Sequence, residues 1–328
     1  MEWIDRVDAL RRSHWRRLFS VGAALVMGLA AGGSSAEAPI RIVVPVNAGG
    51  TLDALGRLLA RHLATAMNET VMVENRPGAG AVIGTEQVVR SRPDGRTLLL
   101  GSSFVATNAV MYRLNFDPLA DLKGVVTLSE GETLLAVHAG LEIRTVADLL
   151  VAARQRPAGL NCGAPPGQLA FGCERLRLLL GGNVVSIPYA GVAPALTALA
   201  AGQIDLMFAP RASLSPVVAS GKVRALASAA PRKASAPYSQ LPLLKDTWPE
   251  MVSYGYAGIY VAAQTPAPLV EALNDAFNRV LAQVEVRQAM LELGYFPMGG
   301  PTDLPGRLLA QELASYTRLA AQIGLKPQ

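Results

Sequence analysis

The feature that most constrains the fold is a repeated alternation of short apolar strands with amphipathic helices, joined by glycine-containing turns. It begins with a strand at residues 40–45, a turn containing two glycines, and a helix at residues 53–66 whose leucines recur at helical spacing. Strands at residues 71–74 and 97–101 then flank a helix at residues 82–90. This order predicts an α/β fold in which mostly parallel sheets carry helices on both faces.

The alternation restarts in the middle of the chain, which indicates a second lobe. A strand at residues 134–137 precedes this lobe, whose expected strands are residues 160–162, 184–188, 204–208 and 225–228 and whose expected helices are residues 146–156, 169–180 and 194–200. The last part of the chain adds a strand at residues 254–263 and helices at residues 266–283 and 305–323. We therefore expect a discontinuous first lobe, formed by residues 37–138 and 255–328, and a second lobe at residues 139–254. With 328 residues, 51% of them hydrophobic, the chain can fill two cores.

The first 36 residues have the pattern of a signal peptide. An arginine-rich stretch ends at Arg16 and Arg17, an apolar run follows at residues 18–31, and small residues occupy positions 32–36. The run is shorter than the roughly 20 strongly apolar residues of a membrane span, although an uncleaved anchor is the alternative. We expect cleavage after Ala36 or Ala38 and export to the periplasm by the general secretory route, with a twin-arginine route as the alternative.

Charge and composition exclude several classes of function. The formal net charge is +5, but without the first 36 residues there are 25 basic and 22 acidic side chains, and no basic cluster contains interleaved aromatic residues. We therefore expect no nucleic-acid partner. His62 and His138 lie far apart, without Cys or acidic partners at ligand spacing, so we expect no metal site. G-x-S-x-G, P-loop and H-E-x-x-H motifs are also missing from the sequence, which favours a binding protein without a cofactor over an enzyme.

The two cysteines, Cys162 and Cys173, are eleven positions apart. In an oxidising compartment they can form a disulfide that closes a small loop. Two free buried thiols are the alternative, and the sequence does not decide between them.

The turn at residues 45–53 is the first candidate binding element. Gly49 and Gly50 allow positive φ angles and close approach, so that backbone N–H groups and the start of the following helix can face an anion. Asp53 can cap that helix or hold an amine or hydroxyl of a ligand. The alternative is that the glycines only form the turn and that Asp53 only caps the helix.

Equivalent strand-to-helix turns recur later in the chain. The loop at residues 163–168 joins a predicted strand to a predicted helix, and Tyr189 and Asp205 lie near the ends of further strands. Open α/β sheets bind ligands at the carboxyl ends of their strands, so we expect a cleft there. A half-buried aromatic role for Tyr189 and a capping role for Asp205 are the alternatives.

A second glycine-rich loop, at residues 75–80, is followed by Gly84. Its spacing, G-x-G-x-x-x-G, is one residue longer than the dinucleotide-binding fingerprint, and the loop follows the second strand of the series. We therefore do not expect a nicotinamide cofactor.

Taken in order, these turns resemble the Bug-type substrate-binding proteins of tripartite tricarboxylate transporters. The resemblance extends from about residue 40 to the final helix, and its strongest motifs are PVNAGGTLD at residues 45–53, VENRPGAG at 73–80, PDGRTLL at 93–99, PYAGVAPAL at 188–196, GQID at 202–205 and GKVRALA at 221–227. The resemblance implies two α/β lobes of the periplasmic-binding-protein type II fold, which close on a small carboxylate held largely by backbone amides.

By position, the resemblance also implies a set of ligand-binding residues in each lobe. In the first lobe these are Ala48, Gly49, Gly50, Thr51, Asp53, Ser102 and Ser103, and in the second lobe they are Gly163, Ala164, Gly167, Gln168, Tyr189 and Asp205. The chain departs from the family at two places. Val46 replaces the usual aromatic residue after Pro45, and Gly167-Gln168 replaces a common glycine-serine pair that is followed by a histidine.

The resemblance implies a periplasmic receptor that captures a carboxylate-bearing metabolite and delivers it to membrane transporter subunits. We expect it to act as a monomer. The alternative is a periplasmic sensor that presents the bound ligand to a signalling partner. Neither the motifs nor the composition identifies the ligand.

Overall fold

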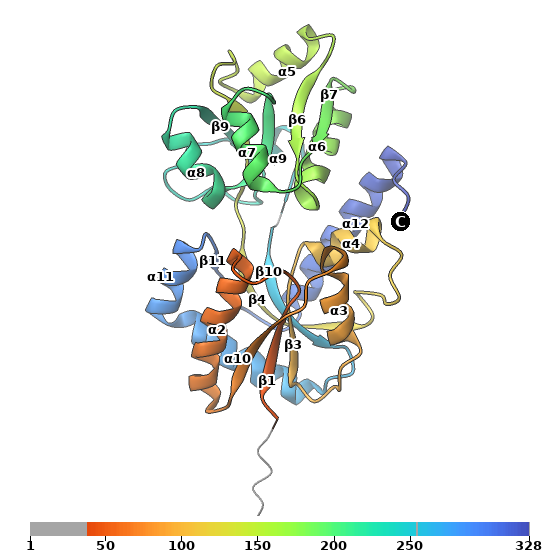
Figure 1. Cartoon of the computed structure of the whole chain (residues 1–328), viewed down its shortest axis with the longest axis vertical. Helices are drawn as coiled ribbons and strands as arrows, with labels where there is room; N and C mark the ends of the chain where they lie inside the picture. The colour runs from red at the N-terminus through yellow and green to blue at the C-terminus, as the bar shows by residue number, and fades with distance from the viewer. Residues whose placement is uncertain (1–37, 254, 328) are drawn as a thin grey trace, which may run out of the picture. The chain divides into compact units, whose positions relative to one another are not determined.

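Two mixed sheets, each covered by helices, organise the part of the chain that the structure describes (Figure 1). The structure is a computed structural model, and it describes residues 38–253 and 255–327. The signal peptide predicted at residues 1–36 lies outside this part, as does Tyr254 at the start of a predicted strand. Among the described helices, none combines the length and the apolar character required to cross a membrane.

The first sheet has the strand order β11-β4-β10-β3-β1-β2. Its strands are β1 (Ile40–Val44), β2 (Val71–Asn75), β3 (Thr97–Ser102), β4 (Leu122–Glu130), β10 (Ala257–Ala262) and β11 (Phe296–Pro297). The strands β2, β1 and β3 are parallel, whereas β10 runs antiparallel to both β3 and β4. The predicted alternation of strands and helices is therefore present, with an antiparallel addition from the late part of the chain.

Helices cover both faces of the first sheet, which explains why its strands are apolar at successive positions. The helices are α2 (Thr51–Met67), η1 (Ala79–Ala81), α3 (Val82–Val89), α4 (Phe104–Met111), α10 (Ala267–Ala282), α11 (Val284–Glu292) and α12 (Leu304–Ile323). Side chains alternate across a strand, so Leu98 and Leu100 pack in the cluster with α2 and α10, while Leu99 packs in the cluster with α12.

The second sheet has the strand order β7-β6-β8-β5-β9. Its strands are β5 (Thr133–His138), β6 (Leu160–Ala164), β7 (Val184–Pro188), β8 (Leu206–Pro210) and β9 (Val223–Ser228), and its helices are α5 (Val146–Gln155), α6 (Gln168–Leu179), α7 (Val192–Ala200), α8 (Arg211–Ala219) and α9 (Leu244–Thr247). β6 is parallel to β7 and β8, and β5 is antiparallel to β8 and β9. The architecture is the expected two-lobed α/β fold with a cleft between the lobes.

The position of β5 differs from the predicted division at residue 138, which assigned this strand to the first lobe. The chain leaves the first sheet at the end of β4, and β5 then pairs with β8 and β9 of the second sheet. The helices α4, α8 and α11 and the strand β4 were also not predicted. β4 pairs with β10 and β11, more than 120 residues away along the chain.

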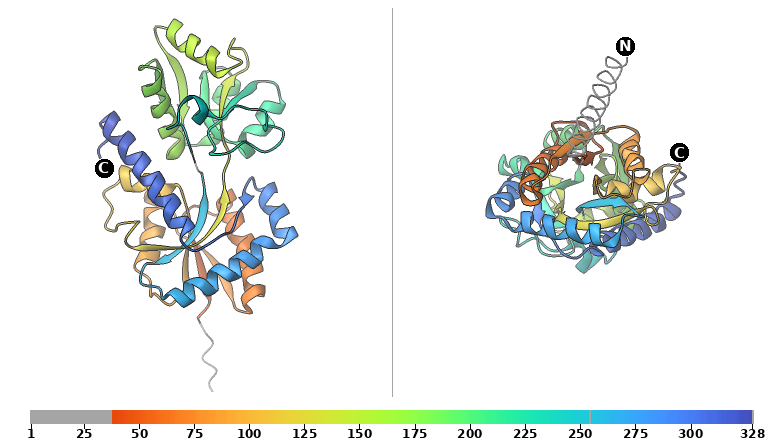
Figure 2. Two further views of the ribbon diagram at one scale, coloured as in Figure 1. Left: turned by 180° about the vertical axis from the view of Figure 1, so that it is seen from behind. Right: turned by 90° about the horizontal axis from the view of Figure 1, so that it is seen from below.

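Two connecting segments pass between the sheets and lie side by side (Figure 2). One joins β4 to β5 through Gly131, and the other returns through Gly255 to β10. The backbone N–H of Gly131 donates to the carbonyl oxygen of Gly255 at 2.8 Å. A Cβ atom on Gly131 would lie 2.5 Å from that oxygen, so the close crossing requires a glycine at this position.

A second contact between the lobes is made by α6 and α12. The rings of Phe171 and Tyr316 stack with their centroids 5.0 Å apart. Arg175 on α6 donates to the Ser315 hydroxyl at 2.9 Å and to the carbonyl oxygen of Val252 at 3.3 Å. The C-terminal helix therefore belongs to the first lobe but also packs against the second.

Candidate functional site

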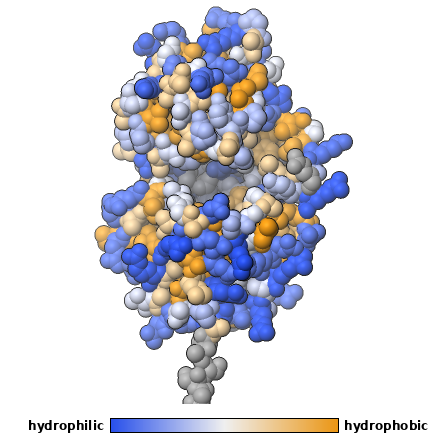
Figure 3. Space-filling view, viewed as in Figure 1, coloured by the Kyte–Doolittle hydropathy of each residue, from blue (hydrophilic) through white to orange (hydrophobic). Residues whose placement is uncertain are grey.

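A cavity of about 340 Å³ lies between the two lobes, at the carboxyl ends of β3, β6 and β8. Figure 3 shows the surface hollowed at this level. The residues that line it are Thr51, Ser102, Ser103, Phe104, Thr107, Gly131, Glu132, Thr133, Pro166, Gly167, Gln168, Leu169, Pro210, Ala212, Ser213, Gly255, Tyr256, Ala257, Leu293, Gly294 and Tyr295. Both lobes and both connecting segments therefore contribute to one cavity.

The helices α2, α4, α6 and α8 all begin at this cavity, with Thr51, Ser103, Gly167 and Pro210 at their starts. None of the four has a side-chain hydrogen bond from its N-cap residue. The first backbone N–H groups of a helix have no partner inside the helix and carry the positive end of its dipole. Two helix starts from each lobe thus present N–H groups that are suited to an anion.

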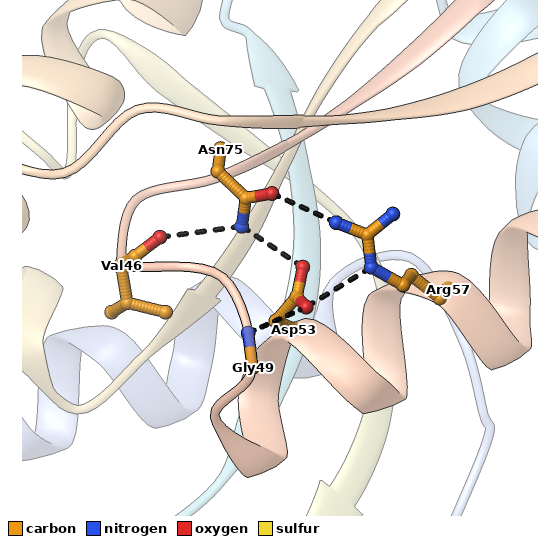
Figure 4. Close-up of polar contacts among 5 residues, drawn as sticks. All are labelled: Val46, Gly49, Asp53, Arg57 and Asn75. Carbon is orange, nitrogen blue, oxygen red and sulfur yellow. Dashed lines mark hydrogen bonds and ion pairs between the residues drawn. The ribbon is translucent and has the colours of Figure 1, made fainter.

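On the first-lobe side, Asp53 organises the turn that precedes α2 (Figure 4). Its Oδ2 atom accepts from the Gly49 N–H at 2.9 Å and from Arg57 Nε at 3.0 Å, and its Oδ1 atom accepts from Asn75 Nδ2 at 2.9 Å. Asn75 also donates to the carbonyl oxygen of Val46. The Arg57 guanidinium, with help from the Gly49 N–H and Asn75, lowers the pKa of Asp53 to about 2 against the opposing effect of burial. Asp53 is therefore ionised and holds the turn in place.

On the second-lobe side, a disulfide fixes the loop that leads into α6. Cys162 on β6 is bonded to Cys173 on α6, which decides the alternative that the sequence left open. Gly167 ends the loop with a φ of 83°, a conformation that favours glycine. Gln168, the first residue of α6, receives a hydrogen bond from the Ser253 hydroxyl at 3.5 Å. The loop and the helix start are therefore held as one unit facing the cavity.

Little net charge is present on the wall of the cavity. Of the residues that line it, all within the described part of the chain, none is Lys or Arg, and the carboxylate among them is Glu132. Glu132 is ion-paired with Arg211 at 2.8 Å and accepts from the backbone N–H and hydroxyl of Ser235. Burial raises the pKa values of Tyr256 and Tyr295, so both phenols stay neutral at pH 7. Hydroxyl and amide groups are therefore the polar atoms available to a ligand.

Of the residues predicted for the site, Thr51, Ser102, Ser103, Gly167 and Gln168 line the cavity. The other predicted first-lobe residues do not line it: Ala48, Gly49 and Gly50 form the turn before α2, and Asp53 lies in the first turn of α2. Gly163 and Ala164 are buried in β6, and Tyr189 is half-buried just after β7, where its N–H donates to the carbonyl oxygen of Ala164.

Asp205 does not line the cavity. It immediately precedes β8, and because β8 runs parallel to β6, its start lies at the end of the sheet away from the cavity. Its carboxylate accepts from Arg156 Nη1 at 2.7 Å and from the Asn161 N–H at 2.8 Å. Asp205 therefore joins the start of β8 to neighbouring segments of its own lobe.

Several lining residues were missed by sequence reasoning, among them Thr107, Glu132, Ser213, Tyr256 and Tyr295. They lie either on elements that are not marked by a glycine turn or a motif in the sequence, or on the connecting segments. Tyr295 reaches the cavity from the loop after α11, where its hydroxyl lies 3.4 Å from the Thr51 hydroxyl. These residues belong to the wall only because distant parts of the chain meet there.

Comparison with known proteins identifies the family. The family model for the tripartite tricarboxylate transporter family receptor matches residues 55–325 of this chain. The chain belongs to this family. Among curated relatives of this receptor, the protein BugT of Bordetella pertussis is 28% identical over 303 residues, which cover 88% of this chain and 90% of BugT.

Solved structures share the same architecture as this receptor. Rpa4515 of R. palustris, solved with adipate, is 28% identical with a TM-score of 0.74, and the match covers 88% of this chain and 98% of Rpa4515. MatC from Rhodopseudomonas palustris, solved with bound malate, is 26% identical with a TM-score of 0.70, and the match covers 86% of this chain and 98% of MatC. The family is one of receptors and not of enzymes.

Proposed function

We propose that this receptor captures a small dicarboxylate in the cleft between its lobes and delivers it to the membrane subunits of a tripartite tricarboxylate-type transporter. The observation that carries the proposal is the group of helix starts, from both lobes, that face one cavity without side-chain caps. A carboxylate placed there can accept from N–H groups at these helix starts that have no partner inside their own helices, and a charge-assisted hydrogen bond is roughly twice as strong as a neutral one.

The volume of the cavity and the ligands bound in related structures both favour a dicarboxylate. A volume of about 340 Å³ lies at the lower end of the range for small-molecule pockets. Adipate and malate, which are bound in two similar structures, are dicarboxylates of this size class. Two ionised ends suit a site in which each lobe offers its own helix starts, so a dicarboxylate can bridge the lobes.

The ligand-binding groups are Thr51, Ser102 and Ser103 of the first lobe and Gly167 and Gln168 of the second. The lobes rotate about the paired connecting segments at Gly131 and Gly255, so the division of the chain falls at these glycines. The receptor acts in the periplasm as a monomer after removal of residues 1–36.

Isothermal titration calorimetry with adipate and malate, followed by C4 to C6 carboxylates, amino acids, nicotinate and aromatic acids, tests the proposal. We expect a dicarboxylate to bind with a stoichiometry of one. Ser102→Ala and Gln168→Ala, one from each lobe, are each expected to weaken binding by about tenfold to about 150-fold, because a hydrogen bond to a charged group contributes about 1.5–3 kcal/mol. An absence of binding by every carboxylate would overturn the proposal.

A further inference from the structure

A buried carboxyl group lies directly behind the cavity wall. Glu312 on α12 is only 3% exposed. Its Oε1 atom accepts from the hydroxyl of Ser103, which lines the cavity, at 3.0 Å and from the Tyr316 hydroxyl at 3.5 Å. Its Oε2 atom is buried and has no hydrogen-bond partner among the described residues. A single hydroxyl therefore separates this carboxyl group from the proposed ligand.

The groups around Glu312 do not compensate a full negative charge. From α6, Arg175 acts on it at a distance, but its hydrogen bonds go to Ser315 and Val252 instead. Tyr260 on β10 and Tyr256, which immediately precedes this strand, face it, and burial keeps both phenols neutral by raising their pKa values.

The other elements packed against α12 add no compensating charge. On β4 the ionisable side chains, Lys123 and Glu130, bind the Thr265 carbonyl oxygen and Arg232 respectively. Helix α4 carries no ionisable side chain.

Burial therefore controls the ionisation of Glu312. It raises the pKa of this carboxyl group to about 7, although the bonds from Ser103 and Tyr316 and the charge of Arg175 oppose the rise. The Gly255 N–H also acts to lower this pKa. Near neutral pH both protonation states are accessible, and a small change in the local potential shifts the balance between them.

The Ser103 hydroxyl couples this balance to the cavity. A hydroxyl has one proton to donate. When Glu312 is ionised, that proton is committed to Oε1, and Ser103 can offer a ligand only lone pairs, which repel a carboxylate. When Glu312 is protonated, it can itself donate to Ser103, and the Ser103 proton becomes available to the ligand.

We propose that Glu312 takes up a proton from solvent when an anionic ligand binds, so that capture of a carboxylate is coupled to proton uptake. The inference rests on the proposed function. A bound anion disfavours a second negative charge behind Ser103, and by reciprocity a proton on Glu312 favours the anion. Above neutral pH the ligand must therefore be captured together with a proton.

Calorimetry of the intact receptor with adipate and malate, in buffers that differ in ionisation enthalpy, measures this uptake directly. We expect about 0.5 proton per ligand at pH 7, where the ligand itself is fully ionised, because this is the fraction of Glu312 ionised before binding. The dissociation constant should rise by up to about tenfold per pH unit above pH 7.

Two variants separate this role from a structural one. Glu312→Gln should bind with no proton uptake and with an affinity that does not change between pH 6 and pH 8. Glu250→Gln, an exposed carboxyl near Arg175, should retain the uptake of the wild type. No binding by either ligand, or by the rest of the carboxylate panel, would overturn the proposed function and this inference with it.

Binding with an enthalpy that is the same in every buffer would overturn the proton coupling and leave the receptor function standing. So would an uptake that persists in Glu312→Gln. If that variant does not fold, the wild-type protein decides the question, because an uptake of zero at both pH 7 and pH 8 contradicts the proposal.

Discussion

Replacing Asp53 by Asn tests how the turn before α2 is held. The carboxylate accepts from Gly49, Arg57 and Asn75, using both oxygens. An Asn side chain keeps only one of these acceptors and turns an NH₂ group toward a donor. We expect the variant to lose stability at pH 7, because three donors converge on a site that needs a full carboxylate.

The size of this loss follows from the pKa of Asp53, which is about 2 compared with an ordinary value of 3.8. That difference corresponds to roughly 2.4 kcal/mol, since one pKa unit is 1.36 kcal/mol. The Arg57 side chain is 54% exposed, so solvent screening reduces the expected contribution to about 1–2 kcal/mol. In a protein of this size the midpoint of thermal unfolding should fall by about 2–3 °C.

The stability that Asp53 contributes depends on pH in one direction. The pKa of Asp53 is lowered by folding, so its stabilisation is fully present above pH 4 and is lost as the pH falls toward 2. Thermal unfolding followed by circular dichroism should show a gap in melting temperature between wild type and Asp53→Asn at pH 7. This gap should close as the pH falls from 4 to 2. Asp275→Asn, at an exposed position on α10, is the control and should show no gap. A gap that stays constant from pH 4 to pH 2 would refute the reasoning.

Three further outcomes are expected. Replacing Cys162 and Cys173 together by Ala should lower the free energy of unfolding by about 3 kcal/mol, because the disulfide closes a loop with a sequence separation of 11. Urea denaturation of the oxidised wild type and of the variant measures this difference. Burial raises the pKa of Glu312 from 4.5 to about 7, so wild-type stability should fall by about 3 kcal/mol as the pH rises from 4.5 past 7, and Glu312→Gln should lack this fall in urea titrations over that range. Asp205→Asn breaks the contacts to Arg156 and Asn161, so it should lower the melting temperature but leave the dicarboxylate dissociation constant within about twofold; a larger loss of affinity would restore Asp205 to the site.

Local sequence patterns predicted the elements whose signals are local. The strand, glycine turn and helix at β1 and α2, and again at β6 and α6, are marked by apolar runs, positive-φ glycines and helical periodicity. Those patterns predicted helices from residues 53 and 169, close to the observed starts at Thr51 and Gln168, so two of the four helix starts at the cavity could be anticipated. The family resemblance added Ser102 and Ser103, which lack a distinctive motif of their own.

The parts that could not be predicted depend on contacts between distant segments. β4 is a strand because β10 pairs along its length, and Tyr295 reaches the cavity only because its loop folds back onto α2. Asp205 was placed in the site because it lies beside a strand, but which end of β8 faces the cleft depends on its parallel pairing with β6. Glu312 gave no signal, since a glutamate within a helix usually faces solvent.

The central claim is that one small anion bridges the two lobes through the starts of their helices. A crystal structure of the receptor with its tightest-binding dicarboxylate tests it most directly. We expect one carboxylate within hydrogen-bonding distance of Thr51, Ser102 or Ser103 and the other within reach of the backbone N–H groups of Gly167 and Gln168. A ligand bound to one lobe alone, or outside the cavity, would contradict the account.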